Sequence, residues 1–410
     1  MSTVSAPLDP SLLGSERPLA DKLILQILPD GAGRLDVTLR VVLSADAPEE
    51  QAAIDAFAPD GTLDLRYTAE LDLDAERNAL SAAFAQLYRK SKVSTQLRAA
   101  ALGKLPLPEL REVLMPVAVR GRSVRRRLLE PEQLRNFGQA DAPAALAALR
   151  SALRREHIVV IKSPVSLFPW AFLYDGEGLN KDNFSTLDVR GFWGFRHQIQ
   201  EEIEGASARV RFAADPVIVA AVSPELDEER EHLQGPLGQL GQAAPERVRW
   251  IDSAEKLRGA LVNFPGDCLY FYGHALQDDP PTPTTSALRI DGLSVTVEEI
   301  LEARGPMFQR PLVFVFLNGC ETAPLNVWNK NSLAGLLCLQ GQCRVCCVTS
   351  FAEVPAAFGR RFGQRFWARF LQGATMGAAL LGARCDLLDE YDNPLGLLYT
   401  LFGRAEVRLG

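Results

Sequence analysis

Two stretches decide the fold class of this chain: DCLYFYGHA at residues 267–275 and PLVFVFLNGC at residues 311–320. Both are short runs of aliphatic and aromatic residues that are apolar on both faces, which is typical of parallel strands covered by helices. Similar patterns alternate along the surrounding chain, with strands expected at residues 216–222, 248–251, 287–290 and 344–349 and helices at residues 226–234, 253–264, 332–340, 355–371 and 375–390. This order predicts an α/β fold with a doubly wound sheet flanked by helices.

The first part of the chain has a different pattern. Apolar and polar side chains alternate over residues 22–27 and 35–43 around a Gly-containing turn, which predicts a β-hairpin. A helical pattern follows from about residue 75 to residue 155, with Ala- and Leu-rich segments such as residues 84–102 and interruptions at Pro106, Pro108 and Pro116. A short buried strand is expected at residues 157–162, and beyond residue 210 strands and helices alternate regularly. We therefore expect a strand-rich region at residues 1–80, a helical region at residues 81–208 and an α/β core at residues 209–410.

Composition and charge exclude several classes of protein. The chain has 410 residues, of which 47% are hydrophobic and 23% charged, as in a globular protein of two or three domains. Its net charge of -7 argues against nucleic-acid binding through overall basic charge. Neither a secretory signal nor an apolar run of the roughly 18 residues that a membrane span needs is visible. We expect a cytoplasmic protein that binds neither membranes nor, directly, nucleic acid.

A histidine and a cysteine follow the two opening strands. His274 and Cys320 would meet at one edge of the sheet if these strands are neighbours, because parallel neighbours lie only about 4.8 Å apart. An imidazole stabilises the thiolate of a cysteine, whose ordinary pKa is about 8.5, and can later protonate a leaving amine. Gly273 and Gly319 allow a peptide to approach, and the N–H of Cys320 with another from a turn after His274 would form an oxyanion hole. On these residues alone, a catalytic dyad and a buried thiol beside a core histidine both stay open.

The motifs resemble the CHAT branch of the caspase-like (separase and caspase) cysteine peptidases. LYFYGHA at residues 269–275 and FVFLNGCETA at residues 314–323 carry the Gly-His and Cys patterns of that family. FPWAFLYD at residues 168–175 resembles its Pro-Trp segment, and NPLGLLYTLFGRAEVRL at residues 393–409 resembles its C-terminal strand region. The resemblance covers about residues 80–410. It implies a caspase-like fold, with His274 as general acid/base and Cys320 as the nucleophile that forms an acyl-enzyme.

The chain departs from the family pattern beside the histidine. Ala275 stands where relatives usually have Gly, and its Cβ restricts the loop that would supply the second oxyanion donor. An alternative function is therefore a catalytically silent caspase-fold adaptor that acts by protein–protein binding. Asp278, Asp279 and Glu321 are candidates for a substrate pocket that binds a basic P1 side chain, against the alternative of solvated loop acids.

The family context implies a protein substrate, no cofactor, and activation by a sensor or effector partner in bacterial defence or programmed cell death.

Other polar motifs have simpler explanations. The run from Cys343 through Cys346 to Cys347 has strand character, which favours packing thiols over a zinc or redox site, so no metal is expected. A basic run predicts a solvated helix surface, a site for an acidic partner or a processing site; it comprises Arg120, Arg122, Arg125, Arg126 and Arg127. Three histidines are isolated in the sequence and are not expected to act directly, namely His157, His197 and His232.

Overall fold

The computed structural model describes residues 21–29, 34–43, 62–80, 82–83, 107–129, 147, 149–163, 168–180, 182–183, 187–202, 215–226, 231–262, 266–276, 287–296, 298–299, 302, 312–319, 343–350 and 354–409. The predicted helices at residues 84–102 and 332–340 lie outside these ranges. So do four of the candidate site residues, which are Asp278, Asp279, Cys320 and Glu321.

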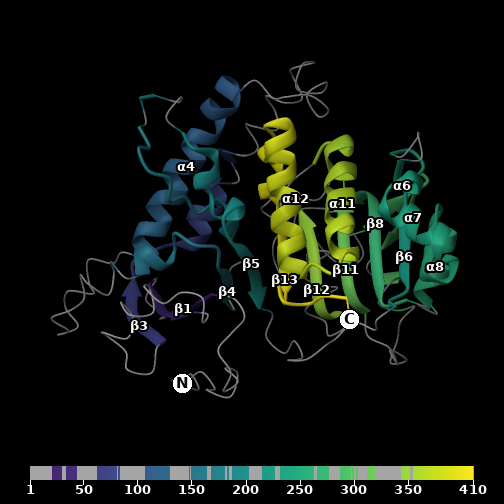
Figure 1. The fold of residues 1–410 in the computed structure, drawn as a ribbon, viewed down its shortest axis with the longest axis horizontal. Coiled ribbons are helices and arrows are strands. Elements are labelled where there is room, and N and C mark those ends of the chain that lie inside the picture. Colours follow the sequence, from purple (N-terminus) through teal and green to yellow (C-terminus); the bar gives the residue numbers. More distant parts are fainter. Residues whose placement is uncertain are drawn as a thin grey trace.

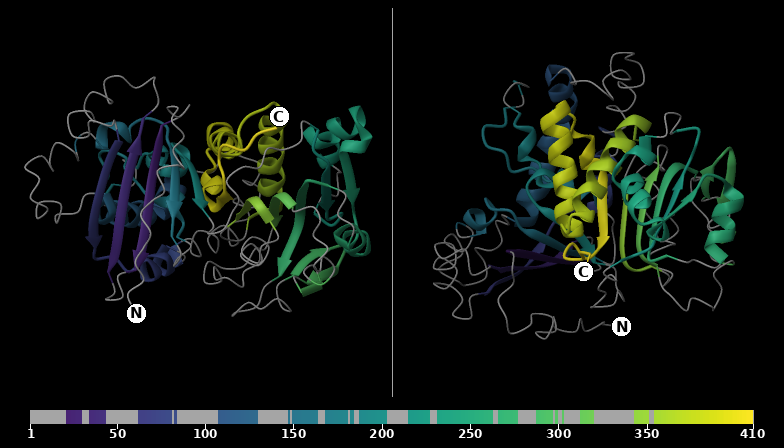
Figure 2. Two further views of the ribbon diagram at one scale, coloured as in Figure 1. Left: turned by 90° about the horizontal axis from the view of Figure 1, so that it is seen from below. Right: turned by 45° about the vertical axis from the view of Figure 1, so that its right-hand side comes forward.

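Thirteen strands form one mixed sheet in the described part of the chain (Figures 1 and 2). They are β1 (Lys22–Pro29), β2 (Leu35–Val42), β3 (Thr62–Ala69), β4 (Ile158–Lys162), β5 (Gln198–Glu202), β6 (Ile218–Val222), β7 (Val248–Ile251), β8 (Cys268–Leu276), β9 (Ala287–Ile290), β10 (Leu293–Thr296), β11 (Leu312–Gly319), β12 (Cys343–Ser350) and β13 (Tyr399–Gly403). Their order is β10-β9-β8-β11-β12-β13-β5-β4-β1-β2-β3, and β6 lies between β7 and β8.

The N-terminal strands confirm the predicted hairpin and extend it. β1 and β2 pair antiparallel from Lys22 opposite Val42 onward, and β3 adds to the outer side of β2. β1 then pairs in parallel with β4, and β4 pairs in parallel with β5. In β2 every second residue is buried, as expected for a strand with one face in the core.

One expectation about the helical region is wrong. Helix α4 (Leu107–Leu129) runs without interruption through Pro116. A proline inside a helix removes one backbone hydrogen bond, at a cost of about 3 kcal/mol. The neighbouring Leu114, Met115, Val117 and Ala118 are all buried, so their packing offsets that loss. The proline therefore does not end the helix.

The C-terminal half has the predicted α/β organisation. β7, β6, β8, β11 and β12 are parallel neighbours in that order, and β13 closes this part antiparallel to β12. In the described part of the chain, the helices that accompany these strands are α6 (Glu231–Gln234), α7 (Pro236–Ala243), α8 (Ala254–Val262), α11 (Ala356–Leu371) and α12 (Met376–Tyr391). Ser253 accepts a hydrogen bond from the Lys256 N–H at the start of α8, which confirms the predicted N-cap. The predicted fold class, a helix-flanked α/β sheet after a strand-rich and then helical region, is confirmed.

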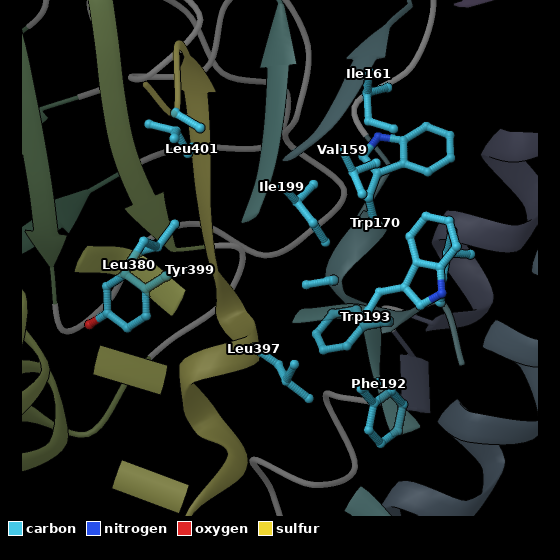
Figure 3. Close-up of a cluster of buried hydrophobic side chains, with 14 of the residues drawn as sticks. Val159, Ile161, Trp170, Phe192, Trp193, Ile199, Leu380, Leu397, Tyr399 and Leu401 are labelled. Atoms are coloured by element: carbon cyan, nitrogen blue, oxygen red, sulfur yellow. The ribbon is translucent and has the colours of Figure 1, made fainter. Parts of the chain in front are cut away.

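The two halves meet between β5 and β13, a junction that we call the seam. The apolar core is continuous there, with Val159 and Ile199 on one side and Leu380 and Leu401 on the other (Figure 3). The Pro-Trp segment forms a short 3-10 helix (Trp170–Phe172) at this place, and its Trp170 is 1% exposed. This segment therefore belongs to the shared core.

The seam also contains a buried arginine from α12. Arg384 is 1% exposed and donates to three backbone carbonyls: its Nε to Gly396 (3.2 Å), its Nη1 to Gly194 (3.1 Å) and its Nη2 to Tyr399 (2.5 Å). Burial lowers the pKa of this guanidinium to about 10. Because Gly194 precedes β5 and Tyr399 begins β13, one side chain ties the two halves together.

Candidate active site

His274 lies where β8 changes its pairing partners. Up to Gly273, β8 pairs in parallel with β11, and through Tyr272 it pairs in parallel with β6 as well; from His274 to Leu276 it pairs antiparallel with β9. In chain order β6 is the first strand of this half and β8 the third, so the strand order reverses between them. Ligands and reactive groups collect at such a switch point, outside the carboxyl ends of the strands. The half-buried His274 is therefore at the edge where chemistry is expected.

The residues before the proposed dyad are register partners. Gly273 on β8 lies directly opposite Gly319 on β11, the last residue of that strand in the structure. Cys320 follows Gly319 in the chain and is outside the described residues. A Cβ on Gly273 would lie 2.7 Å from the carbonyl oxygen of Arg289 on β9. Gly273 is thus required for the close approach of β9. The sequence predicted only that a small residue here would let a peptide approach.

The expected turn directly after His274 is absent. β8 continues to Leu276, and Ala275 lies opposite Leu288 in the β8–β9 pair. The strand continues because Ala275 and Leu288 are both buried on the inner face of this pair. An oxyanion donor from a turn at residue 275, as inferred from the sequence, does not fit this backbone.

Sequence reasoning missed a cation beside the histidine. Arg289 lies directly opposite His274 in the β8–β9 pair, and residues directly opposite in an antiparallel pair share a face with Cβ atoms about 5 Å apart. Arg289 is half-buried, like His274. The hairpin of β9 and β10 therefore brings a positive charge to the candidate site. Its signal in the sequence was a single Arg in the short strand ALRI, which carries no chemical pattern of its own.

A buried polar cluster lies behind the strand end that precedes Cys320. Asn318 is 1% exposed and faces Tyr270 of β8, Gly359 of α11 and Tyr399 of β13, with hydrogen bonds to all three. Tyr270 in turn pairs with Nε2 of His232 at 2.9 Å. In the sequence, Asn318 is visible only as part of the motif that leads to Cys320. Gly359 and Gly363, four positions apart in a predicted helix, were the signal in the sequence that a side chain packs closely against that helix face.

Two of the remaining polar motifs lie in regular secondary structure, the Cys-rich run in a strand and the basic run in a helix. The Cys-rich run lies in β12, as predicted, and Cys268 on β8 is a fully buried thiol. Within the described ranges no group of His, Cys, Asp and Glu side chains could hold a metal ion. Two arginines of the basic run are engaged with the protein itself, since Arg120 and Arg127 both pair with Glu76. The solvated helix surface predicted for this run is therefore only part of its role.

None of the three histidines is isolated in the structure, since His232 pairs with Tyr270 and the other two pair with each other. His157 and His197 form an edge-to-face pair with ring centroids 5.8 Å apart, and the backbone N–H of His157 donates to Nδ1 of His197 at 3.3 Å. Burial lowers the pKa of both imidazoles. The pair lies next to β4 and β5, where it packs the core. A separation of 40 positions concealed this contact in the sequence.

Fold and site together define an α/β protein with a histidine at the switch point of a parallel sheet and a cysteine in the next chain position after the neighbouring strand. A model of the CHAT domain matches residues 121–395, more than half of the chain. The chain therefore belongs to the CHAT domain family, as its motifs predicted, and the family relationship supports a caspase-like peptidase ancestry.

Two further similarities come from individual proteins. A probable protease from Vitiosangium sp. (strain GDMCC 1.1324) is 26% identical over 255 residues, which are 58% of this chain and 32% of the relative. The crystal structure of the Saccharomyces cerevisiae separase–securin complex matches with a TM-score of 0.42 and 11% identity, covering 93% of this chain and 30% of that chain. The chain thus spans about a third of the length of each.

Membrane insertion through a helix finds no support in the described residues, where no helix is both long and apolar enough to cross a bilayer.

Proposed function

We propose that this chain is a cysteine endopeptidase that uses His274 and Cys320 as its catalytic dyad. The observation that carries the proposal is the register that sets Gly273 opposite Gly319. His274 and Cys320 are each one peptide further along, and successive α-carbons are about 3.8 Å apart. Parallel neighbours are separated by about 4.8 Å, so a thiol and an imidazole at these positions are within reach of each other.

The face of the sheet supports the same pairing. Tyr272 donates to the Ala356 carbonyl of α11, and Asn318, its register partner, donates to the Gly359 carbonyl of the same helix. Both side chains therefore lie on the α11 face. Side chains two positions apart in a strand share a face, which gives His274 the face of Tyr272. The proposal extends this alternation of β11 by one residue, to Cys320.

The chemistry would proceed by acyl transfer. The Cys320 thiolate attacks the carbonyl carbon of a peptide bond, and the resulting tetrahedral intermediate collapses to a thioester. The C–N bond breaks as His274 donates its proton to the leaving amine. A water molecule then attacks the thioester with His274 as general base, releasing the new carboxylate and restoring the thiol. The N–H of Cys320 would stabilise the oxyanion.

Pairing of residue 275 favours a second candidate function. Ala275 belongs to the β8–β9 pair and not to a turn, so the second oxyanion donor has to come from elsewhere. Without one, the fold would serve as an adaptor that binds proteins and does not cleave them. Removal of a single oxyanion donor lowers kcat by about 10²- to 10³-fold in a serine protease, so the distinction is measurable.

An electrophilic acyloxymethyl ketone probe separates the two functions. The probe should label Cys320 in the wild type in the presence of the activating partner, and His274→Ala should abolish that labelling. The matched thiol is Cys385, which is half-buried and whose pKa is raised by burial, so its slow labelling should be the same in both proteins. New protein N-termini that appear in cells with the wild type but not with Cys320→Ala identify the substrate. Equal cleavage by Cys320→Ala would end the proposal, and absence of Cys320 labelling would favour the adaptor.

The family context supports a regulated enzyme. We propose that a partner protein activates this chain, that its site of action is the cytoplasm, and that the system serves bacterial defence or programmed cell death. A candidate P1 pocket formed by Asp278, Asp279 and Glu321 would bind a basic side chain, and Arg289 opposite His274 would repel one. A comparison of fluorogenic peptides with Arg, Ala or Asp at P1 decides which charge governs selectivity. Brisk cleavage by the purified chain alone would contradict the need for an activator.

A further inference from the structure

Asn318 sits at the centre of a polar cluster that joins three elements to the end of β11. Its Nδ2 donates to the Tyr270 hydroxyl oxygen (3.1 Å) on β8 and to the Gly359 carbonyl (2.7 Å) on α11. Its Oδ1 accepts from the Tyr399 hydroxyl (2.6 Å) on β13. The amide is 1% exposed, so each of these bonds forms away from water. Loss of a bond to a buried polar group leaves that group unsatisfied, which costs about 1 to 3 kcal/mol.

Helix α11 is built to leave space for this amide. A Cβ on Gly363 would lie 2.5 Å from the Tyr270 hydroxyl oxygen and 2.8 Å from Asn318 Nδ2, and one on Gly359 would lie 3.0 Å from Asn318 Oδ1. Residues four apart share one face of a helix. A glycine inside a helix costs about 0.5 to 1 kcal/mol relative to Ala. Two such residues over one amide mean that the helix gives up intrinsic stability to accommodate the cluster.

Tyr399 connects the cluster to the seam. Its ring stacks on Phe362 with centroids 3.8 Å apart and planes 7° from parallel, so its hydroxyl is held in one place. Its backbone carbonyl accepts from Arg384, the side chain that also binds Gly194 of the other half. Figure 3 shows the ring of Tyr399 on the side of the core away from Trp193. One residue thus binds the end of β11 through its side chain and the seam through its backbone.

We propose that Asn318 is a positioning residue that holds the end of β11, and with it the attachment point of Cys320, in register with His274, and that Tyr399 makes this position depend on the seam. Asn318 reaches no substrate itself, because it is buried beneath α11. It acts through Gly319, whose register with Gly273 sets where the next residue of each strand begins. The consequence for thiol chemistry rests on the proposed function, whereas the effect on the strand end does not.

The test removes the Tyr399 hydroxyl and nothing else. Tyr399→Phe keeps the stacked ring, so the fold should persist. In a peptide covering residues 312–320, the hydrogen-exchange rate of the C-terminal amides should rise about tenfold. Tyr67→Phe is the matched control, because Tyr67 is 4% exposed and donates to the Leu128 carbonyl in the other half of the molecule. It should leave exchange at residues 312–320 unchanged.

A second variant approaches the cluster from the helix side. Gly363→Ala places a methyl group against Tyr270 and Asn318 and should give the same local rise in exchange. Its control is Gly259→Ala in α8, where a Cβ meets nothing within 4 Å and should leave β11 unaffected. Exchange at the end of β11 that stays at the wild-type rate in both Tyr399→Phe and Gly363→Ala would overturn the proposal.

Thiol reactivity separates this inference from the proposed function. The alkylation rate of Cys320 by iodoacetamide is followed against pH by mass spectrometry, with Cys385 as internal reference. Tyr399→Phe should lower the rate near neutral pH about tenfold and move the pH profile toward that of an ordinary thiol. If His274→Ala leaves wild-type reactivity unchanged, the dyad is wrong, and hydrogen exchange alone still decides whether Asn318 positions the strand end. If the dyad is real and Tyr399→Phe does not alter Cys320, the positioning role is wrong.

Discussion

Replacement of Glu201 by Gln should remove a large part of the alkaline instability of this protein. Glu201 is on β5 at the seam, opposite Phe402 of β13, and is 5% exposed. Its Oε1 accepts from the Thr400 hydroxyl at 3.1 Å. Burial raises the pKa of this carboxyl from 4.5 to about 8. The side chain is therefore neutral in the folded protein at neutral pH, and Gln reproduces its shape and its acceptor oxygen.

The sign of the effect follows from proton binding. Between pH 4.5 and about 8 the folded state holds a proton that the unfolded state has lost, so the free energy of unfolding falls as pH rises through this window. The stabilisation is fully present below the unfolded pKa and is lost as pH passes the folded one. Each pKa unit is worth about 1.4 kcal/mol, so a span of about three units, from about pH 5 to about pH 8, amounts to about 4 kcal/mol.

Urea unfolding followed by tryptophan fluorescence measures this difference. The free energy of unfolding of Glu201→Gln minus that of the wild type should rise with pH and level off above about pH 8. Because every other titrating group is common to both proteins, the difference isolates Glu201. A difference that stays constant to within about 1 kcal/mol over this range, or that falls, would refute the assignment of a protonated carboxyl at the seam.

Two further substitutions test the same region. Arg384→Met should lower the free energy of unfolding by about 3 kcal/mol, because three buried carbonyls lose their donor, and urea titration checks it; a neutral effect would show that water reaches these carbonyls. His197→Asn keeps an acceptor for the His157 N–H but removes one of two imidazoles that burial holds neutral. Since the folded state binds fewer protons than the unfolded state below the ordinary histidine pKa, wild-type stability should fall on acidification, and the variant should lose less between about pH 7 and about pH 5. Equal acid sensitivity of the two proteins would contradict this role.

The parts of the fold that sequence reasoning predicted are those with a local signal. β8 and β11 are uninterrupted apolar runs, and Ser253 has the chemistry of an N-cap, so each could be located from its own residues. β5 could not, because its sequence QIQEE is polar and its strand form depends on pairing with β4 and β13. Pro116 misled in the opposite direction, since packing of its neighbours outweighs the lost hydrogen bond.

In the candidate site, too, the residue with a local signal was predicted and the residues defined by long-range contacts were not. His274 was found because a polar residue after an apolar strand marks the carboxyl edge of a sheet, and the structure places it there. The contacts of Asn318 were not found, because its three partners are 48, 41 and 81 positions away. Arg289 could not be assigned to the site from the sequence, because only the β8–β9 register places it opposite His274. The strand that carries it has no distinctive composition. Local pattern therefore predicts which residue lies at the carboxyl edge of the sheet, and long-range contacts decide what surrounds it.

The seam differs physically from the other strand junctions. β4 and β5 share five register pairs, whereas Phe402 opposite Glu201 is the one pair between the described residues of β5 and β13. Side chains supply the remaining ties, since Gln200 accepts from the Ala405 N–H at 2.7 Å and Arg384 reaches carbonyls on both sides. A backbone ladder is insensitive to most substitutions, but a junction held by Glu201, Gln200 and Arg384 can be weakened one side chain at a time. Because Tyr399 begins β13 and binds Asn318, a change at this junction has a short covalent and hydrogen-bonded route to the end of β11. The sensitivity of the end of β11 to seam substitutions such as Arg384→Met should therefore exceed its sensitivity to equally destabilising changes in β1 or β2.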